Sequence, residues 1–507
     1  MNSHFDRKRR RLLGGMGAGL AVGGVASLLP QLGLIANAMA ATGDGYRALV
    51  CVYLGGGNDS FNWLVPRDSE LPGSHYDAYR QARGGVYSAS NGSGLALDFQ
   101  ALLPLASARL TEPMGLHPAC ADFTVSAGEA SQTHAGLASL FNAGHAAFVA
   151  NVGTLTRPIS KSEYQDGAPR PPQLFSHNDQ ELLWQLGMSD VHSPLARFGW
   201  GGRLAQTGAF GTLASGLSSN ISLAGASRFL VGDQVLPYQL GSSGVDLPDH
   251  YGLGGNTTDK ARRAALERLL AAGQDNPYAD EYATTFARAL TVGDRLAGDL
   301  ASDAGRIDTL FPTTAVAQQL RMVARMIKVS RTVLRARRQV YFVRMGGFDL
   351  HDGMFVSGQP VAGSGHGALL GELNQALGAF WSALGEVGAQ ADVTAFTMSE
   401  FARTLSSNGN GSDHAWGGQQ LVLGGSVLGG AVHGRYPRLA LDADDDAAQD
   451  WSFARGQYIP TTSVDQMAAT LSRWMGADEN AIDAIFPSLA KFDLRDLGFM
   501  SAAPTSV

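Results

Sequence analysis

Residues 48–59 read ALVCVYLGGGND, and this stretch decides what kind of fold to expect. Its first seven positions are apolar and rich in β-forming types, which is typical of a strand buried on both faces of a parallel sheet. Three glycines end the run. Similar runs occupy residues 146–152, 339–343 and 393–398, and we predict a buried strand at each of them.

Helical patterns separate these runs. Leu320, Val323 and Ile327 fall on one face of a helix, and a second apolar stripe covers residues 370–384. Strands that alternate with helices build a mostly parallel sheet with helices on both faces. We therefore predict an α/β fold with a mostly parallel central sheet and a helical insertion.

The first 40 residues have the layout of an export signal. A basic cluster at 7–11 precedes an apolar run rich in Gly and Ala at 14–35, and small residues precede Ala41. The stretch RRRLL at 9–13 fits the twin-arginine pattern. We expect the twin-arginine translocase to export the chain to the periplasm or beyond. An uncleaved anchor is the alternative, but the many glycines make this run a poor permanent span.

Cleavage would leave residues 41–507 as one α/β domain. We expect an irregular insertion at about 204–260 and a helical insertion at about 258–335. The whole chain has 38 basic and 45 acidic side chains, and the leader holds five and one of them, so the rest carries a net charge of −11. This acidity argues against a nucleic-acid partner. Cys51 and Cys120 are too few for a disulfide scaffold, and either a disulfide or two buried thiols fits them.

Carboxylates and histidines follow the ends of the predicted strands, where ligands bind in open parallel sheets. They are Asp59 with Ser60 after the first run, Ser176 with His177 beyond the second, Asp349 with His351 after the third, and Glu400, Arg403, Asp413 and His414 beyond the fourth. Such groups suit divalent cations, and two cations could bind a phosphate or sulfate and activate a nucleophile. A turn or a helix cap explains any one of them singly, so the prediction rests on the joint pattern.

Several better-known catalytic motifs are absent from the sequence. It contains no Gly-x-Ser-x-Gly elbow, no Walker loop and no His-Glu-x-x-His helix, and the glycines at 55–57 do not form a dinucleotide fingerprint. These absences argue against an ordinary α/β-hydrolase, a nucleotide triphosphatase and a zincin protease.

Together these stretches resemble the uncharacterised bacterial family called domain of unknown function 1501, over essentially all of residues 45–500. The matching stretches are LGGGND (54–59), SHND (176–179), GWGGR (199–203), GFDLH (347–351), SEFART (399–404), DHAWG (413–417) and PTTSVDQ (460–466). The twin-arginine-type leader is also similar to this family. The family in turn resembles the alkaline phosphatase and sulfatase superfamily.

That resemblance implies two metal ions at the carboxyl edge of the sheet and in-line attack by a Ser, a Thr or a modified Cys. The implied ligands are Asp59, Asp349, His351, Asp413, His414 and the later histidine His433. The catalytic set that we predict is Ser176, His177, Glu400 and Arg403, in which Ser176 attacks and Arg403 clamps an anionic oxygen. Ser60 is the alternative nucleophile. The sulfatase signature Cys-x-Pro-x-Arg is absent, which argues against a formylglycine sulfatase.

Three functions remain open at this point. The first is an exported hydrolase of phosphate or sulfate esters that uses two divalent ions, namely zinc, manganese, calcium or magnesium, on an anionic small molecule or glycan. The second is a non-catalytic relative that binds a surface glycan or an export partner. The third is a metal-dependent transferase acting on a phosphorylated or lipid-linked sugar. We favour the first.

Overall fold

The computed structural model describes residues 45–188, 190, 192–211, 213, 216–245, 256–273, 276–445 and 449–501. The predicted leader at 1–40 lies outside the described residues, and so does part of the predicted insertion at 204–260.

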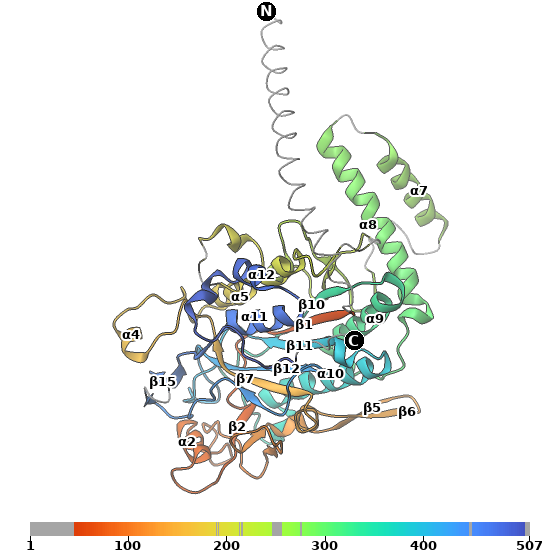
Figure 1. Cartoon of the computed structure of the whole chain (residues 1–507). Coiled ribbons are helices and arrows are strands. Elements are labelled where there is room, and N and C mark those ends of the chain that lie inside the picture. Colours follow the sequence, from red (N-terminus) through yellow and green to blue (C-terminus); the bar gives the residue numbers. More distant parts are fainter. Residues whose placement is uncertain are drawn as a thin grey trace, which may run out of the picture.

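A large mixed sheet forms the centre of the fold (Figure 1). Its long strands are β1 (Arg47–Leu54), β7 (Ala146–Gly153), β10 (Arg338–Met345), β11 (Val393–Met398) and β12 (Gly418–Gly424). The short strands β8 (Asn220–Ser222), β9 (Tyr238–Gln239), β13 (Val432–His433) and β17 (Thr462–Ser463) complete it. The strand order is β13-β7-β12-β11-β1-β10-β8-β9, with β17 beside β7.

The strand β1 lies between two parallel neighbours. Cys51 stands opposite Phe342 of β10 on one side and Phe396 of β11 on the other. In the described sheet, β12 runs antiparallel to β11 and β7, and the other neighbouring pairs are parallel. The four predicted strands and the predicted α/β fold with a mostly parallel sheet are confirmed.

Helices cover both faces of this sheet (Figure 1). One face carries α9 (Ala315–Val329) and α10 (His366–Glu386), and the other carries α5 (His177–Leu186), α6 (Trp200–Ala205), α11 (Val464–Trp474) and α12 (Glu479–Ile485). The apolar stripe at Leu320, Val323 and Ile327 is buried in α9, as its spacing predicts.

Successive side chains of β1 enter two different cores. Val50 and Val52 pack in the core with α9 and α10, whereas Leu49 and Cys51 pack in the core with α6, α11 and α12. Because side chains alternate along a strand, a strand covered on both faces must be apolar at every position. Burial of each such side chain contributes about 1.5–3 kcal/mol, so this apolar run anchors the fold.

Shorter elements surround this body. They are α2 (His75–Ala82), α3 (Leu137–Asn142), α4 (Lys161–Gln165), β2 (Leu64–Pro66), β3 (Leu103–Pro104), β4 (Met114–Leu116), β5 (Phe123–Ala127), β6 (Ala130–His134), β14 (Asp444–Asp445), β15 (Asp450–Phe453) and β16 (Gln457–Tyr458). The stretch at 258–335 holds α9 and, before it, α7 (Thr257–Ala271) and α8 (Pro277–Ala301), which form an arm that projects from the body in Figure 1.

Two other sequence questions are answered by the fold. Cys51 and Cys120 are both buried free thiols, which decides between the two alternatives for this pair. Within the described ranges, no helix combines the length and the apolar character that crossing a bilayer requires.

Candidate metal centre

Loops at the carboxyl ends of neighbouring parallel strands build one cluster of polar side chains. The glycine loop after β1 packs against the loop after β10, since a Cβ added to Gly56 would lie 2.3 Å from the backbone nitrogen of Asp349. A Cβ added to Gly57 would lie 2.4 Å from the ring of Phe401, in the loop after β11. Both glycines have positive φ, at 119° and 78°. Only glycine allows these loops to approach so closely.

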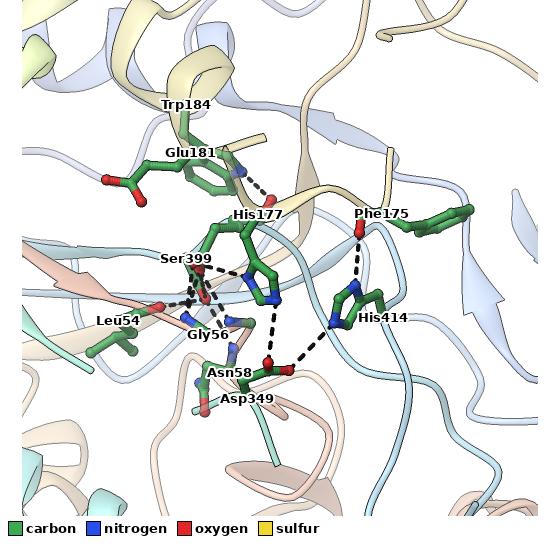
Figure 2. Close-up of polar contacts among 12 residues, drawn as sticks. Leu54, Gly56, Asn58, Phe175, His177, Glu181, Trp184, Asp349, Ser399 and His414 are labelled. Atoms are coloured by element: carbon green, nitrogen blue, oxygen red, sulfur yellow. Dashed lines mark hydrogen bonds and ion pairs between the residues drawn. The ribbon is translucent and has the colours of Figure 1, made fainter. Parts of the chain in front are cut away.

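Asp349 lies at the centre of the cluster. Its Oδ1 accepts a hydrogen bond from Arg403 Nη1 at 2.7 Å and lies 3.1 Å from His351 Nε2 and 3.3 Å from His414 Nε2. Its Oδ2 lies 3.5 Å from His177 Nε2. Figure 2 shows His177 and His414 approaching this carboxylate from two sides. Asp349 is therefore contacted by three imidazoles and one guanidinium.

Each imidazole turns its other nitrogen toward an acceptor. His414 Nδ1 donates to the carbonyl oxygen of Phe175 at 2.7 Å. His177 Nδ1 lies 3.3 Å from Glu400 Oε1, and His351 Nδ1 lies 3.1 Å from Asp413 Oδ1. An acceptor at Nδ1 places the imidazole proton there and leaves the Nε2 lone pair facing Asp349. Histidines that bind metals in proteins are oriented in this way by carboxylates and carbonyls.

Glu400 is held by the backbone of the glycine loop. Its carboxylate oxygens accept hydrogen bonds from the N–H groups of Gly56, at 2.9 and 3.1 Å, and of Gly57, at 3.1 Å. The side chain is almost fully buried, with 2% of its surface exposed. The glycine loop thus fixes Glu400, which in turn fixes the orientation of His177.

Charge in the cluster is balanced by Arg403, which is fully buried. Burial by itself would raise the pKa of Asp349, but the hydrogen bond and charge of Arg403 hold that pKa below its ordinary value. Burial lowers the pKa values of His351 and His414, and the charge of Arg403 acts in the same direction. At neutral pH the centre therefore combines the ionised carboxylate of Asp349 with neutral imidazoles at His351 and His414.

These donors fit a divalent metal ion. The ligand atoms of His177, Asp349 and His414 all lie within 4.8 Å of one another. His177 Nε2 is buried and makes no hydrogen bond to any described residue, and His351 Nε2 faces His414 Nε2 at 3.0 Å. Two nitrogen lone pairs and a carboxylate oxygen at such short distances repel one another, and a cation bound between them would remove that repulsion. Imidazole nitrogens with one carboxylate suit zinc or manganese better than calcium or magnesium.

The structure places the predicted residues in three groups. Seven lie in or around the cluster, namely His177, Glu400, Arg403, Asp349, His351, Asp413 and His414. Two others have different partners, since Asp59 forms a buried ion pair with Arg83 and His433 Nε2 bonds to the carbonyl of Leu428. Ser176 Oγ donates to Asp179 at 2.5 Å, and the alternative Ser60 is buried and accepts from the N–H of Gln419.

The contacts of three predicted residues bear on the roles that the sequence indicated. His177, which we assigned to catalysis, lies in the ligand group, whereas Asp413 bonds to His351 and Arg455. The fully buried Arg403 donates to Asp349 and to backbone carbonyls of Gly56 and Ser412, so it holds Asp349 in place rather than facing solvent.

Some functional groups had no sequence signal at all. The carbonyl of Phe175 and the glycine N–H groups belong to the backbone, which every residue shares. Phe401 stacks on His414, with ring centroids 4.4 Å apart, and contacts the ring of His177. Phe401 is the exception among these groups, because its position three residues after Met398, the last residue of β11, was a signal that could have identified it.

Comparisons with known proteins give one family. A family model described as "Protein of unknown function (DUF1501)" matches residues 46–486. No curated protein matches the chain. Similar solved structures include Ps i-CgsB in complex with k-i-k-neocarrahexaose, at 10% identity and a TM-score of 0.32 over 69% of each chain. Another is the PsFucS1 sulfatase from Pseudoalteromonas sp., at 10% identity and a TM-score of 0.35 over 93% of this chain and 76% of that one.

Proposed function

This chain belongs to the DUF1501 family, whose function is unknown, so its activity has to be inferred from the residues of the candidate site. We propose that it is a metal-dependent hydrolase of phosphate or sulfate esters. One observation carries the proposal: the Nε2 atoms of His177, His351 and His414 converge on the Asp349 carboxylate, and each Nδ1 faces an acceptor. Ordinary structural histidines have no need for this shared orientation.

The residues of the chain would share the work as follows. His177, Asp349, His351 and His414 would hold the ion, and Arg403 would keep Asp349 ionised and in place. Bound there, a divalent cation supplies Lewis acidity toward a phosphoryl or sulfuryl oxygen. Phe401 shields one side of two of the imidazoles from water.

Ser176 is the better candidate for the nucleophile. Its hydroxyl donates to the carboxylate of Asp179 at 2.5 Å, so an acceptor for its proton is already in position. It directly precedes His177 at the start of α5. Ser60, by contrast, is 2% exposed and uses its hydroxyl oxygen to accept the N–H of Gln419. In the hydrolysis that we propose, the Ser176 oxygen would displace the alcohol from phosphorus or sulfur, and the serine proton would pass by way of Asp179 to the departing alcohol. Water would then cleave the serine ester, release phosphate or sulfate and restore the hydroxyl, so that the net reaction adds one water across the ester bond.

The arginines near the centre are already paired. Arg344 bonds to Glu181, Arg403 to Asp349 and Arg455 to Asp413. With a net charge of −11 on residues 41–507, the chain would not steer anions over long distances. An anionic small molecule or an anionic glycan would therefore depend on the bound ion for its attraction.

Metal content and turnover test this proposal together. Elemental mass spectrometry of the purified protein should find zinc or manganese, and a screen of phosphate and sulfate esters should find turnover that a chelator abolishes. His177→Ala should lose the metal and lower kcat/KM at least about 100-fold. His75→Ala is the matched control, since His75 is exposed and pairs with Glu112. A folded wild-type protein that takes up no metal, or a His177→Ala variant with full turnover, would overturn the proposal.

We also propose that the twin-arginine translocase exports the folded chain. The support comes from the basic, apolar and small segments of residues 1–40. Because that pathway carries folded proteins, the metal centre could be assembled before export.

A further inference from the structure

Asp59, which the superfamily resemblance makes a metal ligand, is already paired with a fixed positive charge. It is 1% exposed, and its Oδ2 accepts a hydrogen bond from Arg83 Nη2. Arg83 is fully buried and also donates from Nη1 to the carbonyls of Thr404, at 3.1 Å, and Leu405, at 3.3 Å. The guanidinium is thus held beside Asp59 by the segment that follows Arg403.

Each nearby imidazole uses one nitrogen in a hydrogen bond, and its second nitrogen, His366 Nδ1 or His117 Nε2, is buried without a hydrogen bond to a described residue. His366 Nε2 bonds to Asn58 Oδ1 at 2.9 Å, and His117 Nδ1 accepts the N–H of Ala119 at 3.1 Å. Over the part of the chain that the structure describes, one group of three potential metal-binding side chains has its donor atoms within 4.8 Å of one another. That group is His177, Asp349 and His414. Asp59 belongs to no such group, even though its Oδ1 is buried without a hydrogen bond to a described residue.

Electrostatics oppose a second ion at Asp59. A divalent cation there would lie against the buried guanidinium of Arg83, where little solvent screens the repulsion. Arg403 opposes an ion at Asp349 in the same way, but there the donor atoms of His177 and His414 lie within 4.8 Å of the carboxylate and can offset the repulsion, whereas Asp59 belongs to no such group. Removal of Arg83 would leave two backbone carbonyls without their donor. The residues around Asp59 therefore do not fit a metal ion.

We infer that the centre takes a single metal ion and that Arg83 occupies the place of the second ion that the resemblance implies. This inference rests on the proposed metal site. Two carboxylates that follow neighbouring strands are each neutralised by a buried arginine, Asp59 by Arg83 and Asp349 by Arg403. Asp349 keeps histidine neighbours and remains a ligand, whereas Asp59 does not. The guanidinium of Arg83 thus supplies the positive charge that a second metal ion would otherwise bring to Asp59.

Metal stoichiometry of the purified protein tests the inference. The protein is stripped with chelator, dialysed against excess zinc or manganese, and analysed by elemental mass spectrometry and by titration with the same metal. We expect about one equivalent and a single binding phase. His177→Ala should lose that equivalent. The double variant Asp59→Asn/Arg83→Met removes the buried pair without leaving a lone charge and should keep the equivalent, with circular dichroism to confirm folding.

The outcomes separate this inference from the proposed function. Two equivalents in the wild type, one of them lost in Asp59→Asn/Arg83→Met, would overturn the single-ion inference and leave the proposed hydrolase intact. No bound metal in folded wild-type protein would overturn both. If the double variant does not fold, the wild-type count and its loss in His177→Ala still decide between one ion and two.

Discussion

Glu400→Gln should weaken metal binding although Glu400 is not a ligand. Both carboxylate oxygens accept glycine N–H groups, and Oε1 also faces His177 Nδ1 at 3.3 Å. In glutamine one of these oxygens becomes an NH₂ group. If it replaces Oε1, His177 must accept at Nδ1 and carry its proton on Nε2, which removes the lone pair that faces Asp349. If the NH₂ group replaces Oε2, it faces the N–H groups of Gly56 and Gly57, and their hydrogen bonds to Oε2 are lost.

The size of the effect follows from these contacts. Loss of a carboxylate that orients a ligand histidine costs about 10- to 100-fold in metal affinity. The hydrogen bonds from Gly56 and Gly57 also lose their charge assistance, at about 1 kcal/mol each, so unfolding should become easier by up to about 2 kcal/mol. Competition with a chromophoric zinc chelator measures the first quantity, and urea denaturation measures the second.

A matched control is available close by. Glu181→Gln makes the same chemical change in a carboxylate that pairs with Arg344 outside the ligand group, and it should leave zinc affinity within about twofold. The reasoning would be refuted by a folded Glu400→Gln protein that binds zinc as tightly as the wild type. It would be refuted equally by a Glu181→Gln variant that loses affinity to the same degree.

Three further predictions concern backbone, pH and export. Gly56→Ala should abolish metal binding and lower the melting temperature, because its Cβ would strike the loop after β10, whereas Gly346→Ala, with open space around its Cβ, should do neither. Burial raises the pKa of Asp465 to about 7, whereas the same carboxyl in the unfolded chain loses its proton near pH 4. The free energy of unfolding should therefore fall as pH rises from about 4 to 7. Asp465→Asn should flatten that part of the plot of urea midpoint against pH. An unchanged slope would contradict this. Arg9→Lys/Arg10→Lys should keep the protein in the cytoplasmic fraction, and normal export would exclude the twin-arginine route.

The sheet could be predicted because burial on both faces leaves a direct trace in the sequence. The runs at β1, β7, β10 and β11 carried that trace, and all four are strands. The strand β12 did not, since its two glutamines interrupt the apolar pattern; Gln419 Oε1 accepts the N–H of Asn151, and Gln420 accepts the hydroxyl of Thr397. Buried amides that find partners far away in sequence cannot be distinguished from surface polar residues by pattern alone.

The location of the cluster also followed from the sequence, but the role of each residue did not. The parallel arrangement brings the ends of β1, β10 and β11 to one edge, so Asp349, His351 and Glu400 could be expected there. The long return segments that bring in His177 and His414 leave open which imidazole faces which oxygen. That choice depends on contacts of a few ångströms between segments more than 200 residues apart, such as His177 with Glu400 and His414 with Phe175.

The sequence by itself determined the α/β class, the sheet edge that carries the polar groups, and the residue types available there, because strand burial and strand ends depend on local order along the chain. Asp59 and Asp349 each pair with a buried arginine, and only the tertiary structure decided which of the two also gains histidine neighbours. Asp59 and Asp349 both follow a strand, yet Asp59 forms a buried ion pair with Arg83, whereas three imidazoles lie around Asp349. The physical reason is that a buried charge is defined by its nearest partners, and those partners come from distant parts of the chain.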